Sequence, residues 1–396
     1  MNTAPISHPP TPSRPLRVLD IINLSASADA MLRNRALGMR ARGVDNRIMC
    51  MPGPYVQPLR ERGIPTQAVD LPRAVHPFQM TVALFQMMAY MRRERIDLVH
   101  THCSMPGILG RLAARLAGVP VIVHTIHGLH TTEGAGAVLV RLYDWSERFV
   151  GSFTHLLLSQ NRADLEVARR SGFTAPERMH LIGNGIDLTR FQPEPRIPDP
   201  DGVLTIHCTA RLEPVKNHPM LFEALRRLRA AGRKVRLRLV GDGELRAEYE
   251  RRCAEMGIAE AVDFLGYRDD MTRLLAQSDI AVLTSTKEGI PRAMMEAMAM
   301  KIPVVATRVI GTEETVVDGE TGFLVPLDDV EALTDRLSRL LDDPDLRRAM
   351  GERGRARVEA EFDEYAIVDR LADAYRRLLA TPGVKVPATM MGVAPR

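Results

Sequence analysis

The sequence predicts an α/β protein with two doubly wound domains, each built on a parallel sheet. Short runs rich in β-branched residues alternate with longer amphipathic stretches, which is the pattern of βαβ units. The pattern stops in residues 191–202 (FQPEPRIPDPDG), where proline and aspartate indicate a linker, and then starts again. The length of 396 residues also fits two domains, at roughly 100–200 residues each.

The first domain is predicted to span residues 16–190. Its predicted strands are Arg17–Ile22, Arg47–Met51, Gln67–Leu71, Leu98–Cys103, Val121–His127, Leu156–Ser159 and His180–Ile182. Amphipathic stretches such as Ala30–Arg42 and Ile108–Ala117 are the helices expected between them. Residues 1–15 are rich in proline and lack an apolar core, so a disordered tail is expected there rather than a signal peptide.

The second domain is predicted to span residues 203–362. Its predicted strands are Leu204–Thr209, Arg236–Val240, Val262–Leu265, Ile280–Leu283, Val304–Thr307 and Phe323–Val325. Three helices, Asp328–Leu341, Asp345–Glu359 and Glu364–Leu379, are expected to follow, the last within a segment 363–380, before a frayed tail at 381–396. Doubly wound sheets bind ligands at the carboxyl ends of their strands, so candidate residues are sought there.

No membrane-spanning segment is predicted. The longest apolar stretch, Phe78–Met91, contains two glutamines and ends in the charged run 92–95, so no spanning helix is predicted. Its apolar residues are expected in a core or an interface. The 4 cysteines are scattered without a CxxC pair, which indicates free thiols in a reducing cytoplasm.

Charge is divided unevenly along the chain. Through Arg190 there are 22 arginines, no lysine and 14 acidic residues, a net charge of +8, and the remainder carries −4. A basic half favours an anionic partner, although a solvated arginine-rich surface would explain the same count. The arginines are dispersed without interleaved aromatic residues, so no nucleic acid is expected as a partner.

The richest candidate site follows the predicted strand Ile280–Leu283. Pro291 suits the first position of a helix, which would place Glu288 in the preceding loop and Glu296 about two turns into the helix. Free amides at a helix start suit a phosphate, and Gly289 would let a ligand approach the backbone. Two such carboxylates can accept hydrogen bonds from the hydroxyls of a sugar and a ribose. The alternative is that Glu288 caps the helix and Glu296 lies on the surface.

A second candidate, RLEPVKN, follows the first strand of the second domain. Arg211 offers a planar fork and Lys216 a mobile point charge, so together they could neutralise a diphosphate. Asn217 can cap the helix that is expected to start there. A solvated loop with a helix cap is the alternative interpretation.

Four histidines fall at or near the ends of two neighbouring predicted strands: His100, His102, His124 and His127. This placement favours a site over a core role. Zinc is an alternative, but the spacing is not an established ligand pattern, and no carboxylate or cysteine is seen to complete it. The segments DPD at 199–201 and 343–345 are expected in the linker and at a helix cap, so no metal site is predicted. Gly241 begins a GDG run that lacks the third glycine of a dinucleotide fingerprint.

Taken together, these segments resemble family 4 of the retaining glycosyltransferases, which have the GT-B fold. The resemblance extends from about Arg17 to Leu379. Its strongest signature is the E-x7-E motif, Glu288 to Glu296, and GTEETVVDGETGFLVP, RLEPVKN and HLIGNGIDLTRFQP are also typical. It implies two Rossmann-like domains facing each other across a cleft. The first would bind the acceptor and the second the nucleotide sugar, with the helix in 363–380 crossing back to the first.

The resemblance also implies roles for residues of the second domain. Glu288 would contact hydroxyls of the donor sugar, and Glu296 those of the ribose. Arg211 and Lys216 would bind the diphosphate and stabilise the leaving nucleotide. The remaining donor-binding residues implied by the family are Gly289, Ile290, Gly241, Asp242 and Tyr267.

On the acceptor side, the resemblance places His127 near the anomeric carbon. It places Asn184 and Gly185 at the crossing between the domains. Family members often carry two glycines in the loop after the first strand, whereas this loop reads NLSASA at 23–28. Its small side chains keep some room, and Ser25 is the acceptor-side residue expected there.

The predicted function is therefore a retaining, metal-independent hexosyltransferase without a cofactor. It would move a sugar from a nucleotide sugar, a UDP-sugar by family association, to a lipid-linked saccharide in exopolysaccharide or cell-envelope glycan synthesis. A GT-B sugar-nucleotide epimerase and a non-catalytic GT-B binding subunit are the alternatives. The charge of the first half and the stretch Phe78–Arg95 further predict peripheral contact with an anionic membrane, at the inner face of the plasma membrane.

Overall fold

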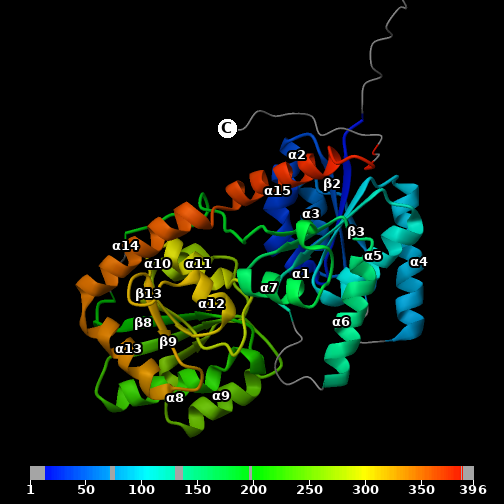
Figure 1. Ribbon diagram of the computed structural model, residues 1–396. Helices are drawn as coiled ribbons and strands as arrows, with labels where there is room; N and C mark the ends of the chain where they lie inside the picture. Colours follow the sequence, from blue (N-terminus) through cyan, green and yellow to red (C-terminus); the bar gives the residue numbers. More distant parts are fainter. Residues whose placement is uncertain (1–13, 72–75, 130–136, 196–198, 385, 387–396) are drawn as a thin grey trace, which may run out of the picture. The chain divides into compact units, whose positions relative to one another are not determined.

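The computed structural model describes residues 14–71, 76–129, 137–195, 199–384 and 386. They form two compact units (Figure 1). Unit 1 takes its residues from 1–160, 164–182 and 368–396, and unit 2 from 161–163 and 183–367. Most of the two expected tails, 1–13 and 387–396, and residues 196–198 of the expected linker lie outside the described residues.

Unit 1 is built on a seven-stranded sheet in which every strand pair is parallel. The strand order is β3-β2-β1-β4-β5-β6-β7, so the order reverses between β1 and β4. Such a reversal is the topological switch point of a doubly wound sheet. The strands are β1 Arg17–Ile21, β2 Asp45–Cys50, β3 Thr66–Ala68, β4 Leu98–His102, β5 Val121–Ile126, β6 Leu156–Ser159 and β7 Met179–Leu181.

Helices connect the strands of unit 1 (Figure 1). They are α1 Ser25–Ser27, η1 Ala28–Leu32, α2 Arg33–Ala41, α3 Val56–Glu61, α4 Pro77–Arg93, α5 Ser104–Ala117, α6 Ala137–Gly151, α7 Arg162–Arg170 and η2 Pro176–Arg178. The single helix expected over Ala30–Arg42 is instead a π-helical turn, η1, followed by α2. α4 packs only one side into the core, where Ala83, Met87 and Met91 are buried.

Unit 2 is built on a six-stranded parallel sheet with the order β10-β9-β8-β11-β12-β13. Its strands are β8 Leu204–Thr209, β9 Val235–Val240, β10 Val262–Phe264, β11 Ile280–Leu283, β12 Val304–Thr307 and β13 Gly322–Val325. The order reverses between β8 and β11, so the loops that follow these two strands meet at the carboxyl edge. The two parallel sheets confirm the predicted fold class.

The helices of unit 2 cover both faces of this sheet, because two separate apolar clusters flank it. They are η3 Pro214–Lys216, α8 His218–Ala230, α9 Arg246–Glu255, η4 Ala259–Ala261, α10 Met271–Ala276, α11 Arg292–Ala299, α12 Ile310–Thr315, α13 Val330–Asp342 and α14 Pro344–Glu361. Asp343 caps α14 by accepting a hydrogen bond from the Leu346 amide at 2.8 Å, as the sequence predicts.

The division between the units falls after Ile182, which is earlier than the expected linker. The reason is packing: Ile186 and Phe191 are buried in one of the two cores of unit 2. The last helix, α15 Glu364–Leu379, begins in unit 2 and belongs to unit 1 from Val368 onward. Within the described part of the chain, no helix is both long and apolar enough to cross a membrane.

Candidate functional site

The loops after β8 and β11 are joined at the carboxyl edge of the unit 2 sheet. Nζ of Lys216 lies 2.6 Å from Oε1 of Glu288, and both side chains are largely buried. Thr284 donates its hydroxyl to the backbone carbonyls of Lys216 at 3.1 Å and Asn217 at 3.0 Å. Because these hydrogen bonds fix one loop to the other, the ammonium and the carboxylate are held in place together. Two candidate residues 72 positions apart in sequence thus form one ion pair.

Two expected helix starts need correction. Pro291 is not the first residue of α11 but its N-cap, with extended backbone at φ −73° and ψ 109°, because the helix begins at Arg292. Glu296 is therefore about one turn into the helix rather than two. Asn217 precedes α8 in the left-handed region, at φ 48° and ψ 44°, and its side chain makes no capping hydrogen bond. Its amide donates instead to Asp328 Oδ1 at 2.9 Å.

The backbone between Glu288 and Ile290 lies against the start of α12. A Cβ added at Gly311 would be only 1.4 Å from the carbonyl oxygen of Gly289. Glycine is therefore required at 311 for this close approach. The same loop is also bound by Asn184, whose amide donates to the Ile290 carbonyl at 3.3 Å.

Glu296 is a largely buried carboxylate beside two arginines. Its Oε1 lies 3.9 Å from Nε of Arg292, which also donates to the Gly185 carbonyl at 2.7 Å. Burial raises the pKa of Glu296 above its ordinary value, although Arg292 and Arg190 partly oppose this and Glu364 adds to it. A hydrogen-bond donor reaching this carboxylate would meet an acceptor that is poorly solvated, which strengthens such a bond.

Arg211 does not join the Lys216–Glu288 pair. Its side chain is 54% exposed, and its guanidinium contacts Oε1 of Glu213 at 2.5 Å. An exposed ion pair of this kind is worth about 0–1 kcal/mol, so the guanidinium can exchange its partner at little cost.

The loops after β9 and β10 lie next to Arg211. The Gly241 amide donates to the Gly266 carbonyl at 2.8 Å, which joins these two loops. Gly241 has φ +134°, and a Cβ there would be 2.1 Å from the carbonyl oxygen of Ala210, so a side chain is excluded. Asp242 is half-buried, and Tyr267, directly after Gly266, is 69% exposed. Arg211, Lys216, Gly241, Asp242, Tyr267 and Glu288 thus lie on loops that follow four strands at one edge of the unit 2 sheet.

In unit 1, the candidate residues Ser25 and His127 follow strands β1 and β5. Ser25 is buried. A Cβ added at Gly53, in the loop after β2, would be 2.1 Å from Oγ of Ser25, so the loops after β1 and β2 are in close contact. His127 Nε2 lies 2.8 Å from Nδ1 of His102. His124 lies in the same sheet, bonded to the Thr101 hydroxyl at 2.9 Å.

The expectation that no carboxylate accompanies the histidines is wrong, because Asp20 of β1 lies beside them. Donor atoms of Asp20, His100 and His102 are all within 4.8 Å of one another, so this group has the composition of a metal site. However, Nη2 of Arg35 already lies 2.8 Å from Asp20 Oδ1 and 2.5 Å from His100 Nδ1. A cationic side chain therefore takes the place that a metal ion would need.

The histidines of this group are neutral. Burial, with repulsion from Arg35, lowers the pKa of His102 to about 4, although Asp20 opposes this. The pKa values of His100, His124 and His127 also lie well below the ordinary value, in each case mainly because of burial. The group is a neutral polar network around one carboxylate rather than a cluster of charges.

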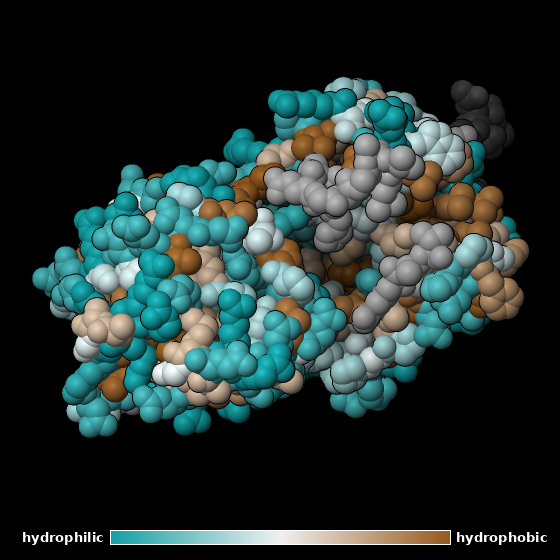
Figure 2. Space-filling view, turned by 90° about the horizontal axis from the view of Figure 1, so that it is seen from below, coloured by the Kyte–Doolittle hydropathy of each residue, from teal (hydrophilic) through white to brown (hydrophobic). Residues whose placement is uncertain are grey.

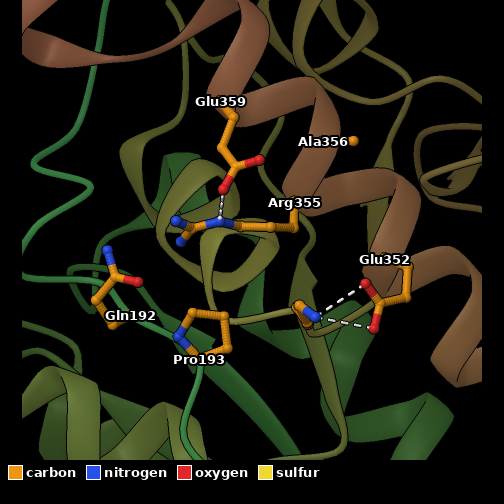
Figure 3. A pocket seen from close by; sticks show the side chains of 7 residues that line it. Gln192, Pro193, Glu352, Arg355, Ala356 and Glu359 are labelled. Carbon is orange, nitrogen blue, oxygen red and sulfur yellow. Dashed lines mark hydrogen bonds and ion pairs between the residues drawn. The ribbon is translucent and has the colours of Figure 1, made fainter.

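A separate pocket lies away from these strand ends. It has a volume of about 450 Å³ and is lined by Gln192, Pro193, Lys301, Glu352, Arg355, Ala356 and Glu359 (Figure 3). Its charged side chains pair with one another, Lys301 with Glu352 at 2.9 Å and Arg355 with Glu359 at 2.6 Å. Arg355 also donates to two backbone carbonyls, which indicates a structural role.

Comparison with known proteins decides the family. Residues 28–185 match the Glycosyl transferase 4-like domain, and residues 192–357 match Glycosyl transferases group 1. The chain is 31% identical over 305 residues to the UDP-Gal:alpha-D-GlcNAc-diphosphoundecaprenol alpha-1,3-galactosyltransferase of Escherichia coli, covering 74% of this chain and 78% of that protein. The chain is a family 4 glycosyltransferase.

Other relatives act on different donors. The glycosyltransferase is 30% identical over 326 residues to a GDP-mannose-dependent phosphatidylinositol monomannoside mannosyltransferase of Corynebacterium glutamicum, covering 78% of this chain and 83% of that one. Its fold matches that of Anabaena HepE, solved with UDP and glucose, with a TM-score of 0.78 and 20% identity over 91% of this chain and 100% of that one. These likenesses establish the GT-B type of fold.

Sequence reasoning about the glycosyltransferase missed Asp20 and Arg35. The available signal was an acidic residue inside the apolar strand RVLDI, where a buried charge needs partners. Those partners come from β4 and α2, and only the strand order brings them together.

Proposed function

We propose that this glycosyltransferase moves a sugar from a UDP-sugar to a lipid-linked saccharide, with retention of configuration and without a metal ion. The observation that carries the donor site is the Lys216–Glu288 pair at 2.6 Å, held at the switch point of the unit 2 sheet. The E. coli relative is named for UDP-Gal and a diphosphoundecaprenol-linked sugar, and HepE was solved with UDP, which supports these substrates.

In this proposal, the donor's diphosphate lies against Lys216 and Arg211. Lys216 is fixed by its ion pair, whereas the exposed Arg211 exchanges Glu213 for a phosphate oxygen. The amides of Gly289 and Ile290 contribute further donors beside α12. The fixed ammonium of Lys216, the mobile guanidinium of Arg211 and these amides stabilise the leaving nucleotide, which is the task that a metal ion performs elsewhere.

The two carboxylates hold different parts of the donor. Glu288 binds hydroxyls of the transferred sugar, and Glu296, buried beside Arg292, binds the ribose hydroxyls. Gly241, Asp242 and Tyr267 border the nucleotide, and the close packing of Gly241 on Ala210 holds their loops beside Arg211. His127 and Ser25 of unit 1 bind the acceptor side, and Asn184 and Gly185 hold the loop at Ile290 in position.

We further propose that the enzyme acts at the cytoplasmic face of an anionic membrane. Unit 1 exposes large apolar side chains on α4 and α6, namely Phe78, Phe85, Leu142, Trp145 and Phe149. α5 packs against both helices, and apolar surface is visible there (Figure 2). The exposed arginines 92, 93, 141 and 148 lie on the same two helices. Apolar rings flanked by basic residues suit an anionic interface, where a lipid-linked acceptor would be found.

The test is a turnover assay with UDP-glucose, UDP-galactose and GDP-mannose, each with and without diphosphoundecaprenol-linked GlcNAc. Release of nucleotide that depends on the acceptor, continues in EDTA and gives a product of retained configuration is the expected result. A new sugar nucleotide formed without acceptor would identify an epimerase. Binding of donor without turnover would identify a non-catalytic subunit. Activity that EDTA abolishes and manganese restores would contradict metal independence.

A further inference from the structure

Three side chains of unit 1 form a hydrogen-bonded chain that ends at His127. His127 Nε2 lies 2.8 Å from Nδ1 of His102, and His102 Nε2 lies 2.9 Å from Oδ1 of Asp20. Asp20 comes from β1, His102 from β4 and His127 from the residue after β5, and these strands are neighbours in the sheet. Each link uses a single ring nitrogen, so the proton position in one ring determines that in the next.

Asp20 determines which group donates and which accepts in each of these hydrogen bonds. Burial alone would raise the pKa of Asp20, but Arg35, His102 and Asn46 together lower it below the ordinary value. Arg35 donates to its Oδ1 at 2.8 Å and Asn46 to its Oδ2 at 2.6 Å, so the carboxylate is ionised. An ionised carboxylate only accepts hydrogen bonds, and His102 must therefore present a proton on Nε2.

The direction then passes to His127. Neutral His102 has one ring proton, so with Nε2 protonated its Nδ1 can only accept. His127 must donate to it from Nε2, which leaves the lone pair on Nδ1 of His127. That Nδ1 is buried and makes no hydrogen bond to the residues that the structure describes, although an interaction with the Gln160 side chain opposes the lowering of the His127 pKa. A buried acceptor without a partner is costly unless a ligand satisfies it.

We propose that Asp20 and His102 are positioning residues that hold His127 in its Nε2–H tautomer, so that Nδ1 accepts a hydrogen bond from a substrate hydroxyl. The tautomer follows from unit 1 alone, whereas the hydroxyl rests on the proposed function. A fixed acceptor selects a group that donates, such as a sugar hydroxyl, and disfavours a phosphate or carbonyl oxygen. The histidine would otherwise present either a donor or an acceptor.

The tautomer can be measured without any assay of activity. Full-length protein labelled with ¹⁵N-histidine gives long-range ¹H–¹⁵N correlations that distinguish protonated from unprotonated ring nitrogens, and His127→Gln assigns the signals of His127. The wild-type protein should show His127 protonated on Nε2. In His102→Phe the ring is kept but the acceptor is lost, so a share of the His127 proton should move to Nδ1.

Two further variants separate positioning from damage to the fold. His102→Asn keeps an oxygen near the place of Nδ1, so it should restore the Nε2–H tautomer of His127. His124→Asn is the matched control, because His124 is equally buried in the same sheet but bonds Thr101 rather than the chain. It should leave the His127 signals unchanged. Turnover of the UDP-sugar donor should fall about three- to tenfold in kcat for His102→Phe and less for His102→Asn.

The outcomes distinguish the inference from the function it rests on. A wild-type His127 protonated on Nδ1, or unchanged His127 signals in folded His102→Phe, would overturn the role of Asp20 and His102. If the tautomer moves but kcat does not, the contact between His127 and substrate is wrong. If the wild-type protein turns over no donor while the tautomer behaves as expected, the proposed function fails and the positioning stands.

Discussion

The strand-end loops of unit 2 and the histidine group of unit 1 hold polar side chains in opposite ways. In unit 2, Lys216 and Glu288 keep full charges in a short ion pair between two loops, and the exposed Arg211 pairs with Glu213. In unit 1, the four histidines are neutral, and His100 and His102 lie beside one buried carboxylate, Asp20. The first arrangement suits a ligand that brings its own charge, and the second suits one that brings hydroxyl groups.

The largest expected effect tests whether the Lys216–Glu288 pair takes part in the reaction or is only structural. Glu288→Gln should lower kcat about 10²–10³-fold, with a smaller rise in the donor KM, because its contact strengthens as the transferred sugar gains positive charge. Arg211→Ala should also act on kcat, through the leaving nucleotide. Steady-state kinetics over donor concentration measure both effects.

The matched control is a second lysine–glutamate pair in unit 2. Lys301 and Glu352 lie 2.9 Å apart, but both side chains are exposed and line the pocket of Figure 3. Glu352→Gln should change kcat and KM less than twofold, since exposed pairs contribute little. Equal losses in Glu288→Gln and Glu352→Gln would show that the ion pair at the strand ends has no special role.

The sequence predicts the charged site better than the neutral one, for a physical reason. Glu288, Glu296, Arg211 and Lys216 follow recognisable strand ends, and parallel strands bring such loops to one edge whatever the register. The partners Asp20 and His102 are 82 positions apart, and their hydrogen bond depends on β1 lying beside β4. Composition and spacing do not specify that pairing.

Helix ends were predicted less well than strands. The strands agree within a few residues because β-branched runs are buried on both faces of a parallel sheet. The start of α11 and the conformation of Asn217 depend on local contacts, with Asp328 for Asn217, that no periodicity reveals.

The next prediction concerns acidification, which should affect the two units differently. A histidine whose folded pKa lies below its unfolded value of about 6.5 contributes stability above pH 6.5, and this is lost as the pH falls toward the folded pKa. Unit 1 has five such histidines, with the pKa of His102 at about 4, and the others are His100, His124, His127 and the half-buried His155. Unit 2 has two, His207 at about 3 and His218 at about 4, both lowered mainly by burial.

Between pH 6.5 and 5, each neutral buried histidine should cost up to about 1.4 kcal/mol of stability per pH unit. The three additional histidines should therefore make unit 1 lose up to about 4 kcal/mol more per pH unit than unit 2. Hydrogen exchange of peptides from β4 and β5, compared with peptides from β8 and β11, measures the opening of each unit. Equal loss of protection in both would contradict the neutral network.

A sharper comparison is possible inside unit 2, between its two carboxylates. Glu296 is predicted to hold the ribose, which does not change during the reaction, so its contact stabilises ground state and transition state alike. Glu296→Gln should raise the donor KM roughly ten- to a hundredfold with little change in kcat, as expected for a hydrogen bond to a charged group. Loss of kcat in Glu296→Gln, with only KM changed in Glu288→Gln, would reverse the two assignments.

The smallest expected effect concerns the apolar surface on α4 and α6. Trp145 is the only tryptophan of the chain and is 64% exposed, so its fluorescence reports insertion directly. Anionic liposomes should shift its emission to the blue, and neutral liposomes should do so much less.

Replacing Arg92 and Arg93 with glutamine should weaken binding about fivefold for each charge, at roughly 1 kcal/mol per arginine near an anionic surface. Added salt should weaken the liposome binding of the wild-type protein more than that of this variant, since exposed charges are screened. Leu37→Ser, which removes an exposed apolar residue from α2, is the matched control and should bind as the wild-type protein does. Equal emission shifts with neutral and anionic liposomes would show that the apolar rings, and not the arginines, account for the binding.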